Sequence, residues 1–189
     1  MQNCNFLISS RGVQPLHSIL EKLSCAQTAF FRAADSVAAG QWNTKPKPDE
    51  WSAAELVAHL VMVERTIIGS ADRITQKTPK AIPFLRRFHF PMWMVESRII
   101  RRKSPIPLDP SLLNTKEEML GELRAARERT LAFLAETSKR DLSAYCWPHP
   151  FLGMLNGYEW FEMMASHEIR HTKQMREIAA RLPKAVESA

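Results

Sequence analysis

The sequence has no run of about 18 apolar residues, and this excludes an ordinary transmembrane helix. Its first 12 residues contain only a short apolar run at 6–8 and no early positive charge, so we expect no signal peptide. The three cysteines, Cys4, Cys25 and Cys146, are few and odd in number and form no CxxC motif. A disulfide framework is therefore not expected, and a reducing cytoplasm is the location that we predict.

Glycine is also scarce, with six residues among 189, and runs of β-branched residues are rare. Ala, Leu, Glu, Arg and Met, which favour helices, are abundant. The apolar fraction of 45% and the charged fraction of 24% are those of an ordinary soluble protein. A chain of this length can bury one sizeable core, so we expect a single all-α domain over residues 1–189.

The net charge of +6 is concentrated in one part of the chain. Residues 77–103 hold eight basic residues and one acid, Glu96, which leaves −1 for the remainder. The mixture of aromatic and basic side chains over 84–103 is one that nucleic-acid or membrane surfaces use. The alternative, which we favour, is a crossover whose aromatic rings cover the protein while its arginines stay in water, because no nucleic-acid motif accompanies the segment. Binding of an acidic substrate is a further alternative.

Four segments show apolar residues at spacings of three and four, the pattern of a helix with one buried face. The first helix is expected over 13–39, followed by Gly40 with a positive φ. The other three are expected over 52–78, 115–138 and 156–182. Each of these three begins with a cap residue followed three positions later by a glutamate, namely Ser52 with Glu55, Thr115 with Glu118, and Asn156 with Glu159.

Four long amphipathic helices with little strand signal predict a four-helix bundle with its core over about 13–182. The connections 40–51 and 139–155 are expected to be loops of moderate length. The connection 79–114 contains six prolines. A structureless loop of that length is unusual, so we expect it to contain a short helix near 90–102. The predicted fold is therefore a bundle with a long crossover between its second and third helices.

Three histidines stand out as candidate metal ligands. His167 and His171 lie one turn apart on the inward seam of the fourth helix, where two imidazoles can chelate one ion. His59 lies within the apolar stripe of the second helix. Burying an imidazole is costly unless its polar atoms are satisfied, and a shared divalent ion would satisfy them and keep an open coordination position. The alternative is a non-catalytic helical binding protein in which these histidines are hydrogen-bonded core residues.

Residues 167–171 also match the HExxH motif of zinc proteases, in which the glutamate is the general base. We reject that interpretation because Gln174 replaces the glycine of the longer motif and only 18 residues follow His171. Glu168 is expected to point towards a neighbouring helix or solvent. We interpret Gln174 as a polar residue at the wet end of the seam rather than one that orients a ligand, and Arg170 as the partner of a glutamate on the second or third helix.

Two segments resemble the DinB-like (YfiT-like) superfamily. Residues 51–60, WSAAELVAHL, are similar to its W-S-x-x-E-x-x-x-H-L segment, and residues 167–174 to its last-helix H-x-x-R-H-x-x-Q segment. The helix order and the spacing of the two segments fit as well. The resemblance implies a four-helix bundle in which His59, His167 and His171 bind a divalent ion, zinc or nickel, with iron or manganese as alternatives.

The superfamily includes transferases and isomerases that use low-molecular-weight thiols such as bacillithiol or mycothiol, and proteins described as metal-dependent hydrolases. The resemblance therefore implies a metal-dependent hydrolase or thiol S-transferase that acts on a small molecule. It also implies a homodimer, since homodimers are common in the family. It assigns no catalytic residue beyond the ligands. The insertion 79–114 departs from the shortest members and leaves the pocket and the substrate open.

Overall fold

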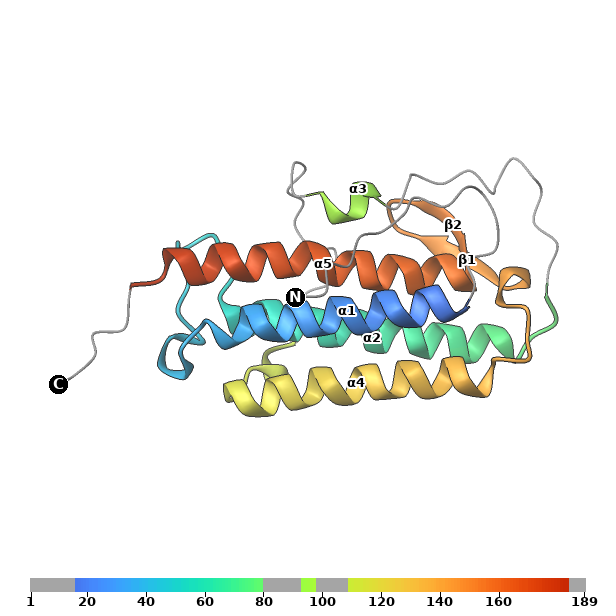
Figure 1. Ribbon diagram of the computed structural model, residues 1–189, viewed down its shortest axis with the longest axis horizontal. Coiled ribbons are helices and arrows are strands. Elements are labelled where there is room, and N and C mark those ends of the chain that lie inside the picture. The colour runs from blue at the N-terminus through green and yellow to red at the C-terminus, as the bar shows by residue number, and fades with distance from the viewer. Residues whose placement is uncertain (1–15, 80–92, 98–108, 184–189) are drawn as a thin grey trace.

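The computed structural model describes residues 16–79, 93–97 and 109–183. Its long helices are α1 (Leu16–Asp35), α2 (Ala53–Thr75), α4 (Lys116–Glu136) and α5 (Gly157–Arg181). Figure 1 shows that α1 and α5 run in one direction and α2 and α4 in the other, with α1 packed along α5 and α2 along α4. This is the predicted four-helix bundle, with the long crossover between α2 and α4. None of the described helices has the length and hydropathy to cross a membrane.

The three predicted capping boxes are all present. In each, the side chain of the cap residue accepts a hydrogen bond from the backbone N–H three positions on, and the glutamate there accepts one from the cap residue's own N–H. These reciprocal bonds satisfy two N–H groups that the first turn leaves unpaired, which fixes where α2, α4 and α5 begin. The sequence therefore located the starts of these three helices to within a residue or two.

The end of α1 differs from the prediction. The helix stops at Asp35, four residues earlier than expected. Gly40 lies in a 3₁₀ helix, η1 (Ala39–Gln41), and its φ is not positive, so the prediction of a left-handed glycine there is wrong. The chain instead leaves α1 by a tight turn in which Val37 N–H donates to the Ala34 carbonyl, and this turn carries Trp42 into the core.

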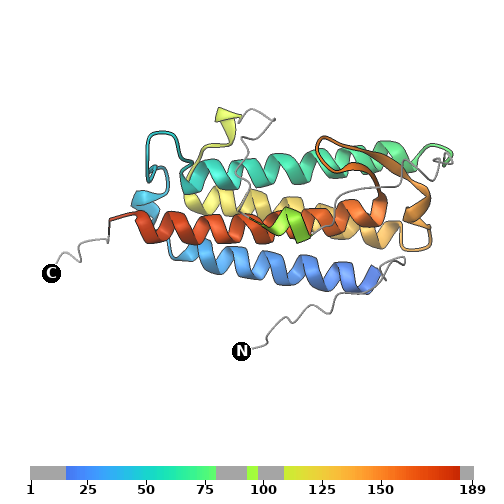
Figure 2. The same cartoon turned by 90° about the horizontal axis from the view of Figure 1, so that it is seen from above.

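The connection 139–155 is not the plain loop that we expected. After a 3₁₀ helix, η4 (Leu142–Ala144), strand β1 (Cys146–His149) pairs antiparallel with β2 (Gly153–Asn156). Gly153, with a φ of 91°, is the first residue of β2, directly after the turn. Strands of four residues are too short to display a convincing alternation in the sequence, which explains the error. In Figures 1 and 2 the hairpin lies beside the N-terminal half of α5.

The predicted short helix near 90–102 is confirmed as α3 (Trp93–Glu96), which lies on α5 in both views. Its last residue holds it there. The Glu96 carboxylate accepts from the Ser166 hydroxyl at 3.0 Å and pairs with Lys22 at 3.1 Å, while Lys173 donates to the Glu96 carbonyl. A further 3₁₀ helix, η3 (Pro110–Leu112), precedes α4. The predictions for the remainder of the basic aromatic segment 84–103 fall outside the described residues.

The described core consists of two apolar clusters, one towards each end of the bundle. The first gathers around Phe30, Leu56, Leu123 and Met175, and the second around Leu23, Ile67, Phe133 and Phe161. Between them, buried polar side chains from three helices form a layer across the bundle. We call this set the polar layer, and it consists of Glu64, Arg127, Thr130 and Glu168.

Candidate metal centre

Three histidines from two helices converge at one point between α2 and α5. His59 Nε2 lies 3.3 Å from His167 Nε2, and His171 Nε2 lies 3.1 Å from that same atom. One ring nitrogen from each residue lies within 4.8 Å of the other two. His59 and His171 are buried, while His167 is partly exposed, so the cluster is in contact with solvent through His167. The structure thus brings together the three residues that the sequence singled out.

Burial keeps the three imidazoles neutral. Desolvation lowers the pKa of His59 to about 4. The pKa values of His167 and His171 lie well below the ordinary value of 6.5, first because of burial and then because of neighbouring histidines and the positive charge of Arg170. A neutral imidazole has one nitrogen with a free lone pair, which is the form that binds a metal ion.

Gln174 fixes the orientation of His171. Its carbonyl oxygen Oε1 lies 3.0 Å from His171 Nδ1, so Nδ1 carries the proton and donates it. The lone pair of His171 Nε2 is then left facing the other histidines, which is the role of a residue that supports a metal ligand. Our interpretation of Gln174 as a mere polar residue at the end of the seam was wrong, because the spacing of three returns its side chain to the face of His171.

The cluster suits a divalent ion. Nitrogen ligands about 2.0–2.1 Å from a tetrahedral ion lie about 3.3 Å apart, close to the separations of 3.1 and 3.3 Å found here. Lone pairs at such separations repel one another unless a cation or a proton lies between them. His59 Nδ1 is buried and has no hydrogen-bond partner among the described residues, so only its Nε2 side is engaged, by the cluster. The three-histidine cluster could therefore hold a metal ion.

Trp51 forms a wall of the site. Its ring centroid lies 5.0 Å from that of His59 and 6.4 Å from that of His171, with the latter pair stacked at 18°. Trp51 directly precedes Ser52, whose capping box with Glu55 fixes the start of α2 and thereby the place of the indole. The Trp-Ser pair of the sequence motif thus has a local reason: the serine starts the helix and the tryptophan shields the histidines.

Glu168, the glutamate of the HExxH match, turns away from the histidines. Arg127 of α4 donates from Nη2 to Glu168 at 2.9 Å, and from Nε and Nη2 to Glu64 of α2 at 2.7 and 3.1 Å. Arg127 Nη1 also donates to the carbonyl of Leu23 in α1, so this one side chain of α4 contacts each of the three other long helices. Glu168 is therefore not placed to act as a base at the cluster, which agrees with our rejection of the protease motif.

The two carboxylates share Arg127 unequally. Glu64 accepts two hydrogen bonds from Arg127 and one from the Thr130 hydroxyl, whereas Glu168 accepts one, and its Oε1 has no partner among the described residues. Burial raises the pKa of Glu168 to about 7, and repulsion from Glu64 adds to the rise, although the Arg127 charge opposes it. Arg127 was not predicted from the sequence, although a basic residue four positions after Leu123 on an apolar seam was a signal for it.

A fourth histidine, on the hairpin, was also missed. His149 ends β1, in the segment that we had interpreted as a loop. Its ring centroid lies 5.1 Å from that of Trp160, and burial lowers its pKa to about 4, so this imidazole is neutral as well. No spacing rule connects it to the other three histidines, because it belongs to the hairpin.

Comparison with known proteins places this architecture in a family. A profile of the DinB superfamily matches residues 22–175. The chain belongs to the DinB superfamily. The resemblance inferred from residues 51–60 and 167–174 is thereby confirmed, and both segments of this DinB superfamily member carry the histidines described above.

Two individual proteins are similar to this DinB superfamily chain. The uncharacterized protein YuaE of Bacillus subtilis (strain 168) is 29% identical over 144 residues, which make up 76% of this chain and 86% of YuaE. The crystal structure of TT2238, a four-helix bundle protein, matches with a TM-score of 0.56 and 18% identity, over 86% of this chain and 98% of that one. The second likeness concerns the fold alone, and it supports the four-helix bundle.

Proposed function

We propose that this DinB superfamily protein is a metal-dependent enzyme whose divalent ion is held by His59, His167 and His171. The observation that carries the proposal is the convergence of three neutral imidazole Nε2 atoms at 3.1 and 3.3 Å. Zinc or nickel is the ion that we expect, with iron or manganese as alternatives. Imidazole is a good ligand for zinc, nickel and iron, and manganese ranks last because it prefers oxygen ligands.

The chain's own residues prepare the site in three ways. Gln174 sets the tautomer of His171, Trp51 covers one side of two rings, and the partial exposure of His167 leaves a way in for a small molecule. When bound, a divalent ion held by three neutral ligands supplies Lewis acidity and lowers the pKa of a water or thiol that coordinates it.

Two reactions use this chemistry, namely hydrolysis of a small substrate and S-transfer from a low-molecular-weight thiol. Both need a nucleophile that is deprotonated near neutral pH, and both are compatible with a glutamate that is turned away from the site. We propose that the protein performs one of these two reactions, as a homodimer. Light scattering tests the homodimer, since a dimer would have twice the chain mass of 21.6 kDa.

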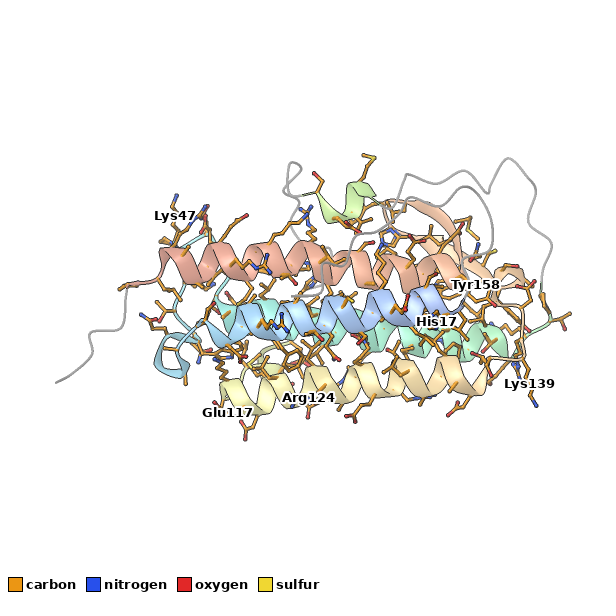
Figure 3. All side chains as sticks on the ribbon, in the orientation of Figure 1. His17, Lys47, Glu117, Arg124, Lys139 and Tyr158 are labelled. Atoms are coloured by element: carbon orange, nitrogen blue, oxygen red, sulfur yellow. The ribbon has the colours of Figure 1, made fainter. Side chains whose placement is uncertain are left out.

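The metal site is tested by measuring bound metal in untagged protein purified without chelator and then supplied separately with Ni²⁺, Zn²⁺, Fe²⁺ or Mn²⁺. We expect near-stoichiometric binding of at least one ion, lost in His59→Ala and in His171→Ala. The matched control is His17→Ala, because His17 lies on the outside of α1 with its side chain 82% exposed (Figure 3). If the wild type binds none of these ions, the proposal is wrong and a metal-free helical binding protein is the better interpretation.

The reaction is tested on the metal-loaded protein. Bacillithiol, mycothiol, glutathione and cysteine are each offered with an electrophilic acceptor, and a panel of small esters and amides is offered in parallel. Turnover that is retained in His17→Ala and lost in His171→Ala would assign the reaction class. Metal binding without turnover in either panel would contradict the proposed chemistry and leave the metal site standing.

A further inference from the structure

The two buried histidines of the cluster are supported in different ways. His171 Nδ1 donates to Gln174 at 3.0 Å, whereas the buried Nδ1 of His59 has no hydrogen-bond partner among the described residues. A histidine that binds a metal through one ring nitrogen almost always uses the other in a hydrogen bond, which fixes the orientation of the ring. With its Nε2 directed to His167, the ring of His59 lacks that support, so its orientation must be fixed by packing.

The indole of Trp51 supplies this packing. Its ring centroid lies 5.0 Å from that of His59, with 55° between the two planes, and its plane is within 18° of that of His171. The ring centroids of His59 and His171 are in turn 5.1 Å apart, with the planes at 72°. The three rings therefore pack as one group, and rotation of the His59 imidazole would bring it against one of its neighbours.

Trp51 is itself held on both sides along the chain. Glu50, which precedes it, accepts from Arg181 at the end of α5 through both carboxylate oxygens, each at 2.8 Å. Ser52, which follows it, is fixed by the capping box with Glu55. The indole also packs against the first apolar cluster, and a tryptophan side chain has only two torsions to fix. The protein thus sets the position of this ring without help from an ion.

We propose that Trp51 is a positioning residue of the metal centre, which does for His59 by ring contact what Gln174 does for His171 by a hydrogen bond. A ligand that is already held in its binding orientation loses less freedom when an ion binds, so the ion is bound more tightly. Coordination also makes an imidazole more positive, and the face of an indole attracts positive charge. This inference rests on the proposed function, since it requires an ion at the histidine cluster.

The test measures Zn²⁺ affinity by chelator competition in Trp51→Leu, in Trp51→Phe and in a matched control, Phe31→Leu. Leucine keeps an apolar side chain without a flat ring, and phenylalanine keeps a flat ring. Phe31 is a half-buried residue of α1 that packs against the same apolar cluster, with the guanidinium of Arg124 over its ring. Its replacement removes an aromatic ring from that cluster and leaves Trp51 against the histidines.

We expect the Zn²⁺ affinity to fall about 10- to 100-fold in Trp51→Leu, the usual effect of losing a residue that supports a ligand, and to stay within about threefold in Trp51→Phe. Phe31→Leu should bind Zn²⁺ within about twofold of the wild type, even though urea unfolding should show that it destabilises the metal-free protein. The visible absorption bands of bound Co²⁺ should shift in Trp51→Leu and not in Phe31→Leu, because coordination geometry changes when His59 is free to turn.

Equal Zn²⁺ affinity in the wild type and Trp51→Leu, or unshifted Co²⁺ bands in that variant, overturns this inference and leaves the proposed metal site intact. An equal fall in Trp51→Leu and Phe31→Leu overturns it too, because the loss would then reflect the stability of the bundle. An equal fall in Trp51→Leu and Trp51→Phe means that side-chain volume matters and the flat ring does not, which also overturns it. Failure of the wild type to bind any divalent ion refutes the proposed function and this inference together.

A second measurement needs only the conservative variant, in case Trp51→Leu does not fold. Bound Co²⁺ quenches the fluorescence of nearby indoles, so the wild type should lose a larger fraction of its tryptophan emission on Co²⁺ binding than Trp51→Phe does. A larger loss supports the inference, because it means that Trp51 lies against the occupied histidine cluster in solution. An equal fractional loss in the two proteins overturns it.

Discussion

Substituting Glu168→Gln should stabilise the protein at alkaline pH and not at acidic pH. Glu168 is a buried carboxyl group with one hydrogen bond from Arg127 and one oxygen without a partner among the described residues. Glutamine has nearly the same shape, keeps an oxygen that can accept from Arg127, and carries no charge. The substitution therefore removes the cost of the buried charge and little else.

The magnitude follows from the pKa of Glu168, which burial raises from 4.5 to about 7. Because the folded protein binds this proton more tightly than the unfolded chain does, the group contributes most to stability below about pH 4.5 and loses that contribution as the pH rises through 7. At about 1.4 kcal/mol per pKa unit, the loss is about 3 kcal/mol. The free energy of unfolding of the variant minus that of the wild type should therefore rise by about 3 kcal/mol between pH 4.5 and pH 8.

The assay is urea unfolding followed by far-UV circular dichroism at a series of pH values, with chelator present so that no metal contributes. The metal-site histidines titrate in both proteins, so their effect cancels in the difference. Glu128→Gln, on the exposed side of α4, is the control for the loss of one negative charge. A difference that is flat with pH would refute the reasoning, and one that falls with rising pH would mean that Arg127 stabilises the Glu168 carboxylate more than burial destabilises it.

Three further predictions concern the polar layer, the start of α5 and the residue that supports His171. Arg127→Leu leaves two buried carboxylates without a counter-charge and should cost about 3–5 kcal/mol in urea unfolding at pH 8. Gly157→Ala should lower thermal stability by about 1–3 kcal/mol, because a Cβ there would lie 2.9 Å from Leu142 atoms, whereas Gly121→Ala, with open space around it in α4, should raise stability by up to about 1 kcal/mol. Gln174→Ala should weaken metal binding about 10- to 100-fold in a chelator competition assay without loss of helicity, and unchanged affinity would remove Gln174 from the site.

The sequence was most informative where local chemistry decides the structure. A cap residue and a glutamate three positions later need only each other, so Ser52, Thr115 and Asn156 could be placed at helix starts without knowledge of the fold. The end of α1 could not be found in this way. It depends on how Trp42 enters the core, a tertiary contact that overrides the signal from Gly40.

The same division applies to the site. His167 and His171 could be paired because they lie on one helix, and His59 could be added because its apolar stripe had to face theirs. Arg127 and His149 depend on elements that share no periodicity with the three histidines. Arg127 needs glutamates from two other helices, and His149 is held by the hairpin turn, whose N–H groups donate to its Nδ1.

The polar layer between the two apolar clusters also has a consequence for helix register. Apolar side chains can pack against one another in several alignments. The two apolar clusters alone would therefore allow one helix to shift along another by a turn of about 5.4 Å. Such a slide of α5 against α2 and α4 would separate Glu168 from Arg127 and the helix-5 histidines from His59, leaving each group buried against hydrocarbon. The layer thus makes one alignment of the helices far better than its neighbours, and substitutions that neutralise it should yield bundles that are stable but no longer unique.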